Sequence, residues 1–208
     1  MNSYYREKGV TLHAGDTVKT IRKEGSKVSV MTENGMEITA DGIIAGLGIQ
    51  PNIDLARQAG LAIDNGIVVD ECLRTSHPDI YAAGDVANFY SPLLEKRIRV
   101  EHEDNANVMG KMAGENMAGQ SNPYHYQPYF YSDLFDLGYE AIGELDASLD
   151  IVADWKEPFH KGVIYYLRNK QVRGVLLWNT WGQIEAATQL IAEKSEHTQA
   201  TLSGRISD

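Results

Sequence analysis

The segment DIYAAGDVANFY, residues 79 to 90, indicates the fold class of this chain most directly. It begins with a short apolar run, residues 80 to 83, whose length and composition predict a buried strand. The run stops at Gly84, and an ionisable residue, Asp85, follows. A carboxylate at the tip of a strand can accept hydrogen bonds from the hydroxyls of a ribose or polyol, and it can equally form an Asx-type turn. The residues alone leave both interpretations open.

The first forty residues predict a small antiparallel meander. The elements expected are a helix ending at Gly9, a strand at 10 to 15, and β-rich runs at 16 to 25 and 27 to 40. Gly9 suits the position just after a helix. Within the second β-rich run, Asn34 and Gly35 predict a type I′ hairpin turn, because both tolerate a positive φ.

A second glycine-containing strand is expected at residues 41 to 52, DGIIAGLGIQPN. Gly46 and Gly48 resemble half of a dinucleotide-binding fingerprint, but Pro51 stands where the third glycine belongs. Glycines that let a strand end pack closely explain the pattern equally well. Asn52 is the expected cap of a helix over 53 to 60, and a turn at 64 to 66 leads into a further strand.

The residues after Asp85 predict a loop, a helix and then a different kind of domain. Small and Met residues recur every three or four positions between 101 and 119, which predicts an amphipathic helix ending at Gly119. Two prolines and four tyrosines between 120 and 133 indicate a domain boundary. Four strands are expected beyond it, at 138 to 145, 150 to 155, 161 to 169 and 171 to 179, followed by a helix at 181 to 197 and a frayed tail.

Composition excludes several classes of function. The chain has 208 residues and a formal net charge of -10, whereas a nucleic-acid surface needs clustered Lys and Arg. No apolar run approaches the roughly 18 residues that span a bilayer, and residues 1 to 9 lack the apolar core of a signal peptide. We therefore expect a cytoplasmic protein.

Cysteine and histidine usage argues against a disulfide and against a metal site. The single cysteine, Cys72, excludes an internal disulfide and a CxxC pair. The six histidines show no HxxxH spacing and no cysteine partner, so no metal is expected. A serine-hydrolase interpretation fails because G-x-S-x-G is absent.

Three further residues are candidates for a ligand site. Glu101 and His102 lie at the N-terminal end of the helix predicted between 101 and 119, whose dipole there favours negative charge and electron-rich ligands. An acid in the cap region explains Glu101 equally well. Tyr131 lies beside the boundary loop, where its ring could cover a planar ligand, although aromatic residues in strands are mostly core.

The ordered set of segments resembles the flavin-dependent pyridine nucleotide-disulfide oxidoreductases, in particular apoptosis-inducing factors and bacterial ferredoxin and rubredoxin reductases. The segments that carry the resemblance are GIIAGLGIQPN, GIVVDECLRTSHPDIYAAGDVA, RVEHEDNANVMGKMAGENMAG, YFYSDLFDLGYEAIGELD and GVIYYLRNKQVRGVLLWN. The resemblance implies an α/β fold, α+β in its C-terminal part: a partial Rossmann-type FAD/NAD(P)-binding domain and a small α/β domain of the dimerisation type.

Domain boundaries follow from the same resemblance. Residues 1 to 46 resemble the end of the NAD(P)-binding domain, 47 to 122 the returning FAD-binding segment, and 123 to 208 the C-terminal domain. The two Gly-rich nucleotide-binding units of the family have no counterpart in the sequence, and we expect them to lie upstream of Met1. The short link after residue 145 differs from the long insertion of animal apoptosis-inducing factor, so a prokaryotic-type reductase is the better analogy.

The resemblance also implies residue roles. Asp85, after Gly84, matches the aspartate that binds the FAD ribityl chain, and Glu101, His102 and Glu103 match the helix start that faces the isoalloxazine ring. Tyr131 stands where relatives carry Trp beside the flavin. On the NAD(P)H side, Gly48 and Glu140 match residues near the nicotinamide.

Two functions remain open from the sequence. The first is the C-terminal part of an FAD-dependent NAD(P)H oxidoreductase, which passes hydride from nicotinamide to flavin and electrons to a ferredoxin-like, rubredoxin-like or other acceptor. The second is a non-catalytic module: a fragment that dimerises or binds a partner, or one half of a split enzyme. A homodimer through the C-terminal domain is expected in either case, and weak or absent FAD binding by this chain alone.

Overall fold

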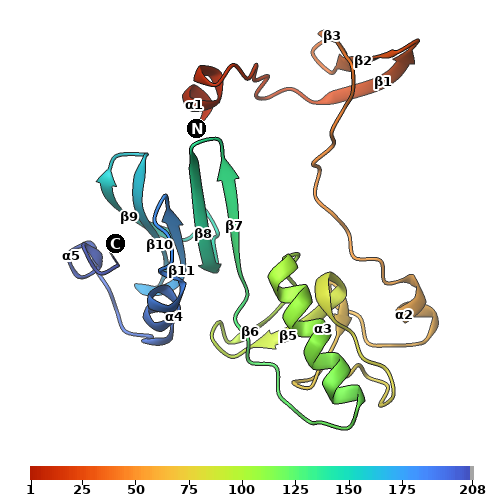
Figure 1. Cartoon of the computed structure of the whole chain (residues 1–208), viewed down its shortest axis with the longest axis vertical. Coiled ribbons are helices and arrows are strands. Elements are labelled where there is room, and N and C mark those ends of the chain that lie inside the picture. Colours follow the sequence, from red (N-terminus) through yellow and green to blue (C-terminus); the bar gives the residue numbers. More distant parts are fainter. Residues whose placement is uncertain (207–208) are drawn as a thin grey trace. The chain divides into compact units, whose positions relative to one another are not determined.

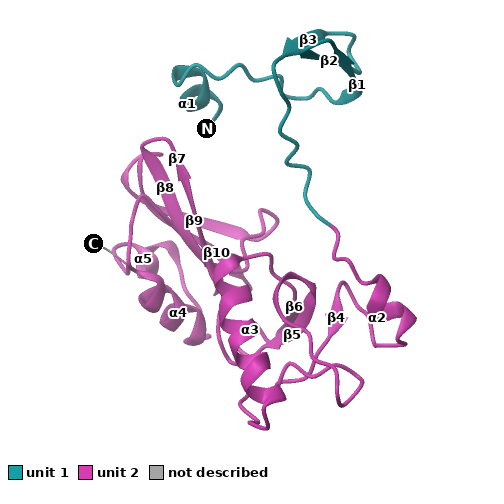
Figure 2. Ribbon diagram, turned by 45° about the vertical axis from the view of Figure 1, so that its right-hand side comes forward, with its two compact units in different colours: residues 1–49 teal, residues 50–208 magenta. Residues whose placement is uncertain are grey.

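A computed structural model describes residues 1–206 and divides the chain into two compact units, one from Met1 to Ile49 and the other from Gln50 onward (Figure 2). The first unit contains one helix and one sheet. Its elements are α1 (Asn2–Glu7), β1 (Val18–Glu24), β2 (Lys27–Thr32) and β3 (Glu37–Ala40). The three strands form an antiparallel sheet in chain order, which confirms the predicted meander.

The turn between β2 and β3 differs from the predicted type. Gly35 has a φ of +83°, but Asn34 does not have a positive φ, so this is not a type I′ turn. The Gly35 N–H donates to the Thr32 carbonyl oxygen at 3.1 Å, and the Thr32 N–H donates to the Met36 carbonyl oxygen at 2.9 Å. A three-residue connection with one left-handed glycine is a common hairpin alternative, and here the loop is one residue longer than a type I′ turn allows.

Two strands predicted in the first unit do not form. Residues 10 to 15 are irregular, and so are residues 41 to 52, which we expected to be buried. Ile44 and Leu47 are 101% and 92% exposed. A strand is held by hydrogen bonds to a neighbour, and no strand within residues 1–206 pairs with this segment. Its apolar sequence alone therefore does not order it as a strand.

The first half of the second unit is a small mixed sheet with one long helix. Its elements are α2 (Asp54–Gln58), β4 (Ile67–Val68), the 3-10 turn η1 (Gly84–Val86), β5 (Ala87–Ser91), β6 (Lys96–Ile98) and α3 (Glu103–Met117). β4 pairs with β5 in parallel, and β5 pairs with β6 in antiparallel fashion. The β5–β6 hairpin lies where we expected a loop.

The prediction of a strand at residues 80 to 83, just before Asp85, is wrong. Tyr81 makes only an isolated bridge to Arg74, and the strand, β5, starts after Asp85 rather than before it. Gly84 has a φ of +74°, which breaks extended backbone and starts η1. Asp85 is therefore held in a tight turn between the bridge and β5.

Helix α3 is present as predicted, but its buried face is more polar than expected. Asn105 and Asn116 are buried with Met109 and Ala113, whereas Met117 is 66% exposed. The Tyr124 hydroxyl donates to Asn105 Oδ1 at 2.7 Å, and Asn116 Nδ2 donates to the carbonyl oxygens of residues 72 and 122. These bonds attach the segment after α3 to the helix.

The second half of this unit is a five-stranded antiparallel sheet packed against helices (Figure 1). Its elements are β7 (Tyr129–Leu134), β8 (Leu137–Gly143), β9 (Asp150–Glu157), β10 (Lys161–Arg168), β11 (Gln171–Trp178), α4 (Ile184–Ala192) and α5 (Gln199–Leu202). The spatial order is β7-β8-β11-β10-β9. The four predicted strands and the α4 helix are confirmed, and the core joins Tyr165, Val175 and Leu177 of the sheet to Leu190 and Ile191 of α4.

Two features of this half were missed. β7 lies in the tyrosine-rich stretch that we interpreted as a boundary loop. Of the tail expected to fray, residues 198 to 206 are ordered, and the last two lie outside the described residues. Thr198 and Thr201 form a capping box at α5, and Leu202 and Ile206 are 0% and 5% exposed. Two apolar residues on an otherwise polar tail are enough to attach it to the core. Among residues 1–206, no helix combines the length and hydrophobicity that crossing a membrane requires.

Candidate functional site

The candidate site is a cavity of about 600 Å³ at the N-terminus of α3. One wall is formed by residues 101–104 and Asn107, and the other by residues 129–131 of β7. This brings together Glu101, His102, Glu103 and Tyr131, which are four of the eight residues predicted to bind a cofactor. The volume lies within the range of ordinary ligand pockets, ~300–1,000 Å³.

The start of α3 is arranged to concentrate backbone N–H groups at this cavity. His102 is the N-cap residue, with extended backbone, and its carbonyl oxygen accepts from the Ala106 N–H at 3.0 Å. The N–H groups of the first turn have no partner within the helix itself and carry the positive end of its dipole. Glu103 and Asp104 lie in that turn, where negative side chains are stabilised.

His102 is the central side chain of the cavity. Its ring lies 4.7 Å from the ring of Phe130, centroid to centroid. Burial lowers the pKa of His102, while the charges of Asp104, Asp85 and Glu101 oppose that shift. The imidazole is therefore biased toward its neutral form, and its Nδ1 atom is buried with no hydrogen-bond partner in residues 1–206.

Gly84 and Asp85 approach the same region from η1, which packs against α3. The Gly84 N–H donates to Met109 Sδ at 3.2 Å. Asp85 is exposed, and its carboxylate accepts no hydrogen bond within the described residues. Its charge nevertheless acts on His102, which places the two side chains in one electrostatic environment.

Arg99 holds these acidic loops together and was missed by the sequence analysis. Its side chain is only 9% exposed, and Nη2 lies 2.9 Å from Glu101 Oε1. Nη1 donates to the Asp85 backbone oxygen at 2.9 Å. The sequence signal was the short basic cluster EKRIR at 95 to 99.

Tyr131 and Glu140 are neighbours across β7 and β8. They are directly paired in the strand register, and Tyr131 is 63% exposed. Glu140 Oε2 accepts from the Gly182 N–H at 2.8 Å, which holds this carboxylate beside the sheet. Phe130, missed because β7 was missed, points its ring toward Tyr139 and His102.

Gly48 belongs to the first unit, so the structure does not place it relative to the other candidates. It has a φ of +79°, which favours glycine, and a Cβ built there would meet no atom within 4 Å in residues 1–206. Its predicted role beside a nicotinamide stays a prediction. No cluster of three or more His, Cys, Asp or Glu that could hold a metal ion occurs in the same residues.

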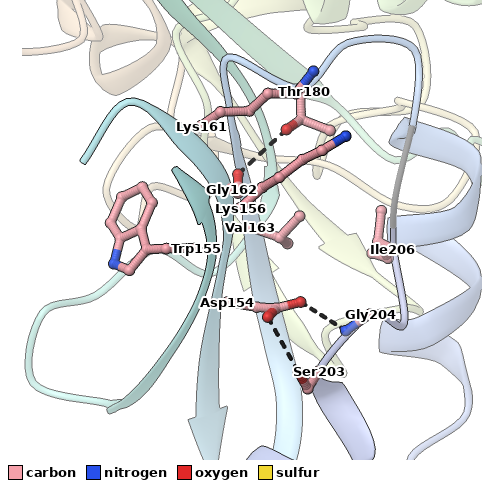
Figure 3. A pocket seen from close by; sticks show the side chains of 10 residues that line it. All are labelled: Asp154, Trp155, Lys156, Lys161, Gly162, Val163, Thr180, Ser203, Gly204 and Ile206. Atoms are coloured by element: carbon pink, nitrogen blue, oxygen red, sulfur yellow. Dashed lines mark hydrogen bonds between the residues drawn. The ribbon is translucent and has the colours of Figure 1, made fainter. Parts of the chain in front are cut away.

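A second cavity, of about 310 Å³, lies between β9, β10 and the C-terminal tail (Figure 3). Its carboxylate, Asp154, is already engaged: it accepts from Ser203 Oγ at 3.3 Å and from the Gly204 N–H at 2.7 Å. Thr180 Oγ1 donates to the Gly162 and Trp178 carbonyl oxygens. The Asp154 bonds hold the tail, whereas the Asp85 carboxylate and His102 Nδ1 have no hydrogen-bond partner within residues 1–206.

Comparison with known families gives two matches that cover most of the chain. Residues 1–110 match "Pyridine nucleotide-disulphide oxidoreductase". Residues 113–158 and 153–193 match the C-terminal region of "Apoptosis-inducing factor, mitochondrion-associated". The two matches meet within α3, at whose N-terminus the candidate cavity lies.

Individual relatives agree with these matches. The chain is 36% identical to apoptosis-inducing factor 1 of Dictyostelium discoideum, over 89% of this chain and 38% of that protein. It is 30% identical to putidaredoxin reductase of Pseudomonas putida, over 91% of this chain and 46% of the relative. The chain thus spans about half, or less, of the length of these curated relatives.

Solved structures show the same partial coverage. A covalent complex of putidaredoxin reductase with putidaredoxin gives a TM-score of 0.82 at 31% identity, over 93% of this chain and 47% of that one. A ferredoxin reductase from Rhodopseudomonas palustris gives a TM-score of 0.80 at 27% identity, over 95% of this chain and 50% of that one.

Proposed function

The chain belongs to the pyridine nucleotide-disulphide oxidoreductase family, and from that membership we propose that it provides the flavin-facing part of an FAD-dependent NAD(P)H oxidoreductase. Asp85 would hold the ribityl chain, and the first turn of α3 would face the isoalloxazine ring. A bound flavin would supply the hydride and single-electron chemistry. The residues of this chain bind, orient and shield it.

The observation that carries this proposal is the unpaired Asp85 carboxylate beside the open N-terminus of α3. The carboxylate can accept hydrogen bonds from ribityl hydroxyls, because no residue from 1 to 206 occupies it. The α3 amides can stabilise negative charge on the pyrimidine edge of the ring. Arg99 binds both loops and holds Asp85 and Glu101 at a fixed separation.

Aromatic side chains complete the environment proposed for the ring. Tyr131 is exposed on β7 and offers a face for stacking, and the ring of its neighbour Phe130 lies 4.7 Å from the His102 ring, centroid to centroid. Such rings exclude water from one side of a planar ligand. Glu140, beside Tyr131, and Gly48, in the first unit, are proposed to contact the nicotinamide of NAD(P)H.

The partners are proposed from relatives. A relative was crystallised in a covalent complex with putidaredoxin, which supports a small redox protein of the ferredoxin or rubredoxin type as the electron acceptor. We propose the boundaries 1–46, 47–122 and 123–208 for the NAD(P)-binding, FAD-binding and C-terminal parts, and a homodimer through the last of these.

The decisive experiment compares two flavins on the purified chain. Riboflavin carries the ribityl chain and lumiflavin does not, and neither has the adenine half. We expect both to shift the amide resonances of the first turn of α3 and of Tyr131, with riboflavin binding more tightly. Asp85→Asn should lower the affinity for riboflavin by about fivefold, because a hydrogen bond to a charged group becomes one to a neutral group. The affinity for lumiflavin should not change.

The matched control is Asp79→Asn, which removes another exposed carboxylate of the same loop region and should change neither affinity. The proposal fails if no resonance near α3 responds to either flavin, or if Asp85→Asn weakens both flavins equally. If the chain binds neither flavin but forms a stable dimer, the result favours the alternative function, a dimerisation module.

A further inference from the structure

The two walls of the candidate cavity belong to different halves of the second unit. The wall formed by the start of α3 is attached to one apolar core, which includes Met109 and Ala113 of the same helix. The wall formed by β7 is attached to the other core, against which Tyr129 packs. Each core stabilises its own wall. The separation between the walls therefore depends on what fixes one core relative to the other.

The β5–β6 hairpin crosses from the first core to the second. Phe89, in β5, is 2% exposed and belongs to the core around α3. Leu94, in the turn of the hairpin, is 3% exposed and belongs to the core under the five-stranded sheet. Ile98, in β6, packs against both cores. The hairpin thus has its strands on one core and its tip in the other.

Polar contacts with the five-stranded sheet hold the tip of the hairpin in the second core. Arg173, in β11, donates from Nη2 to the Leu94 carbonyl oxygen, and its side chain is 15% exposed. Lys96 Nζ, in β6, lies 2.8 Å from Oε1 of Glu144, which follows β8 directly. The sheet therefore holds the hairpin through two different strands as well as through the burial of Leu94.

The other connection between the cores, residues 118 to 128, is itself attached to this hairpin. Ser91 is 1% exposed, and its hydroxyl donates to Gln127 Oε1 at 2.9 Å. The same hydroxyl oxygen accepts from the Leu94 N–H at 3.3 Å. The chain between α3 and β7 is thus bonded to the turn that carries Leu94. A displacement of the hairpin tip would therefore affect both connections.

The two ends of the hairpin lead directly to residues of the candidate site. Asp85 lies just before β5, and Glu101 and His102 lie between β6 and α3. The His102 ring meets the opposite wall at Phe130, with the ring centroids 4.7 Å apart. The hairpin therefore joins the anchored tip to the point where the two walls come closest to each other through their rings.

We propose that Leu94 and Arg173, which anchor the tip of the β5–β6 hairpin, set the separation between the α3 wall and the β7 wall. Neither residue lines the flavin-facing cavity, so both are positioning residues that act through His102 and Phe130. The consequence for a ligand rests on the proposed function. A planar ring gains contacts from both walls at once only if their separation is fixed before it binds.

The first test measures this separation by NMR of the whole 208-residue chain without any flavin. The ring current of Phe130 displaces the resonances of the His102 ring protons, and Phe130→Leu gives their positions without it. Leu94→Ala leaves a cavity at the hairpin tip, and the effect of an aromatic ring falls steeply with distance. We therefore expect this variant to remove about half of the displacement. His102→Asn identifies the His102 signals among those of the six histidines.

Leu190→Ala is the matched control. Leu190 is 2% exposed and belongs to the same core as Leu94, but it comes from α4 rather than from the hairpin. Both variants remove a buried leucine, so a general loss of stability would affect both proteins. Only Leu94→Ala should displace the His102 resonances. Equal displacements in the two variants, or none in Leu94→Ala, overturn the inference.

A second variant covers the case in which Leu94→Ala does not fold. Arg173→Lys keeps a cation beside Glu144 but removes the planar guanidinium, whose separate N–H groups reach both Glu144 and the Leu94 carbonyl oxygen. The His102 resonances should move in the direction of Phe130→Leu, by less than in Leu94→Ala. Resonances that stay in place in folded Arg173→Lys overturn the role of this anchor.

Flavin affinity provides the functional test. Riboflavin and lumiflavin share the same ring, so Leu94→Ala should weaken both by about fivefold and leave the ratio of their affinities unchanged. Asp85→Asn, in contrast, should change that ratio. Leu190→Ala should change neither affinity.

The outcomes separate this inference from the proposed function. If both flavins bind and Leu94→Ala weakens neither, the inference is overturned and the proposed function stands. If the chain binds neither flavin, the proposed function fails, and the His102 resonances alone decide whether the hairpin sets the separation of the walls.

Discussion

The two units differ in how their secondary structure is stabilised. In residues 1–49 the only buried side chains are those of Ser29 and Thr32, and the strands form a sheet without an apolar core. The second unit has two apolar clusters, one around α3 and one under the five-stranded sheet. Strand pairing in the first unit therefore depends on backbone hydrogen bonds and a hairpin turn, whereas in the second unit apolar clusters also support the sheets and helices.

This difference shows where the residues of the candidate site can be held precisely. Asp85, His102 and Tyr131 are positioned by a turn, a helix end and a strand that all pack on buried residues. Gly48 lies in an exposed segment without strand pairing, and a Cβ built there would meet no atom within 4 Å in residues 1–206. Conformational freedom in such a segment is lost only when another surface covers it.

The largest contrast should come from removing apolar side chains. Leu177 in β11 is fully buried, so Leu177→Ala should lower the free energy of unfolding of the second unit by about 3–4 kcal/mol through lost burial and a cavity. Ile44→Ala is the counterpart in the first unit. Because Ile44 is fully exposed, this variant should change the free energy of unfolding of the first unit by less than about 0.5 kcal/mol. Denaturant unfolding measures both, and equal effects would contradict the comparison.

The next largest contrast should come from replacing glycines that have a positive φ. A Cβ at Gly66 would lie 2.6 Å from the Val86 carbonyl oxygen and 2.8 Å from Arg99 Cδ, so Gly66→Ala should cost about 2–3 kcal/mol. Gly35 meets nothing within 4 Å, so Gly35→Ala should cost only the backbone strain, about 1 kcal/mol. Thermal unfolding of each variant gives the two values, and a larger loss for Gly35 would reverse the expected order.

Removing the Glu144 carboxylate should cost less than Gly66→Ala or Leu177→Ala, and its effect should depend on pH. This carboxylate pairs with three cations, which are Lys96, Arg168 and Arg173. Glu144→Gln leaves them without their anion and should cost about 2 kcal/mol at neutral pH. Burial raises the pKa of Glu144, but the three cations outweigh burial and lower it below its ordinary value of 4.5. The stabilisation is present above that value and is lost as the pH falls through the folded-state pKa. The difference in the free energy of unfolding between the unmodified protein and Glu144→Gln should therefore become smaller as the pH is lowered.

The control for that prediction is Glu33→Gln in the first unit. Glu33 lies 3.4 Å from Lys19, with both side chains more than half exposed. Exposed pairs contribute ~0–1 kcal/mol because solvent screens them, so this variant should have little effect at any pH. A pH-independent cost for Glu144→Gln would show that packing, rather than charge, is responsible.

Local sequence signals were sufficient for several elements. The spacing of small and Met residues between 101 and 119 correctly predicted α3, and the predicted strands and helix beyond residue 137 also form. The ordered family segments also indicated the fold class and the set of candidate residues. All these signals involve residues that are close in the chain, so they can be recognised from the sequence alone.

What the sequence by itself determined was the type of most elements, the family, and the residues at the start of α3. Only the tertiary structure decided that residues 41 to 52 stay unpaired, that the tail is held by Leu202 and Ile206, and that Arg99 links Asp85 to Glu101. The physical reason is that pairing, burial and ion pairing depend on partners distant in the chain.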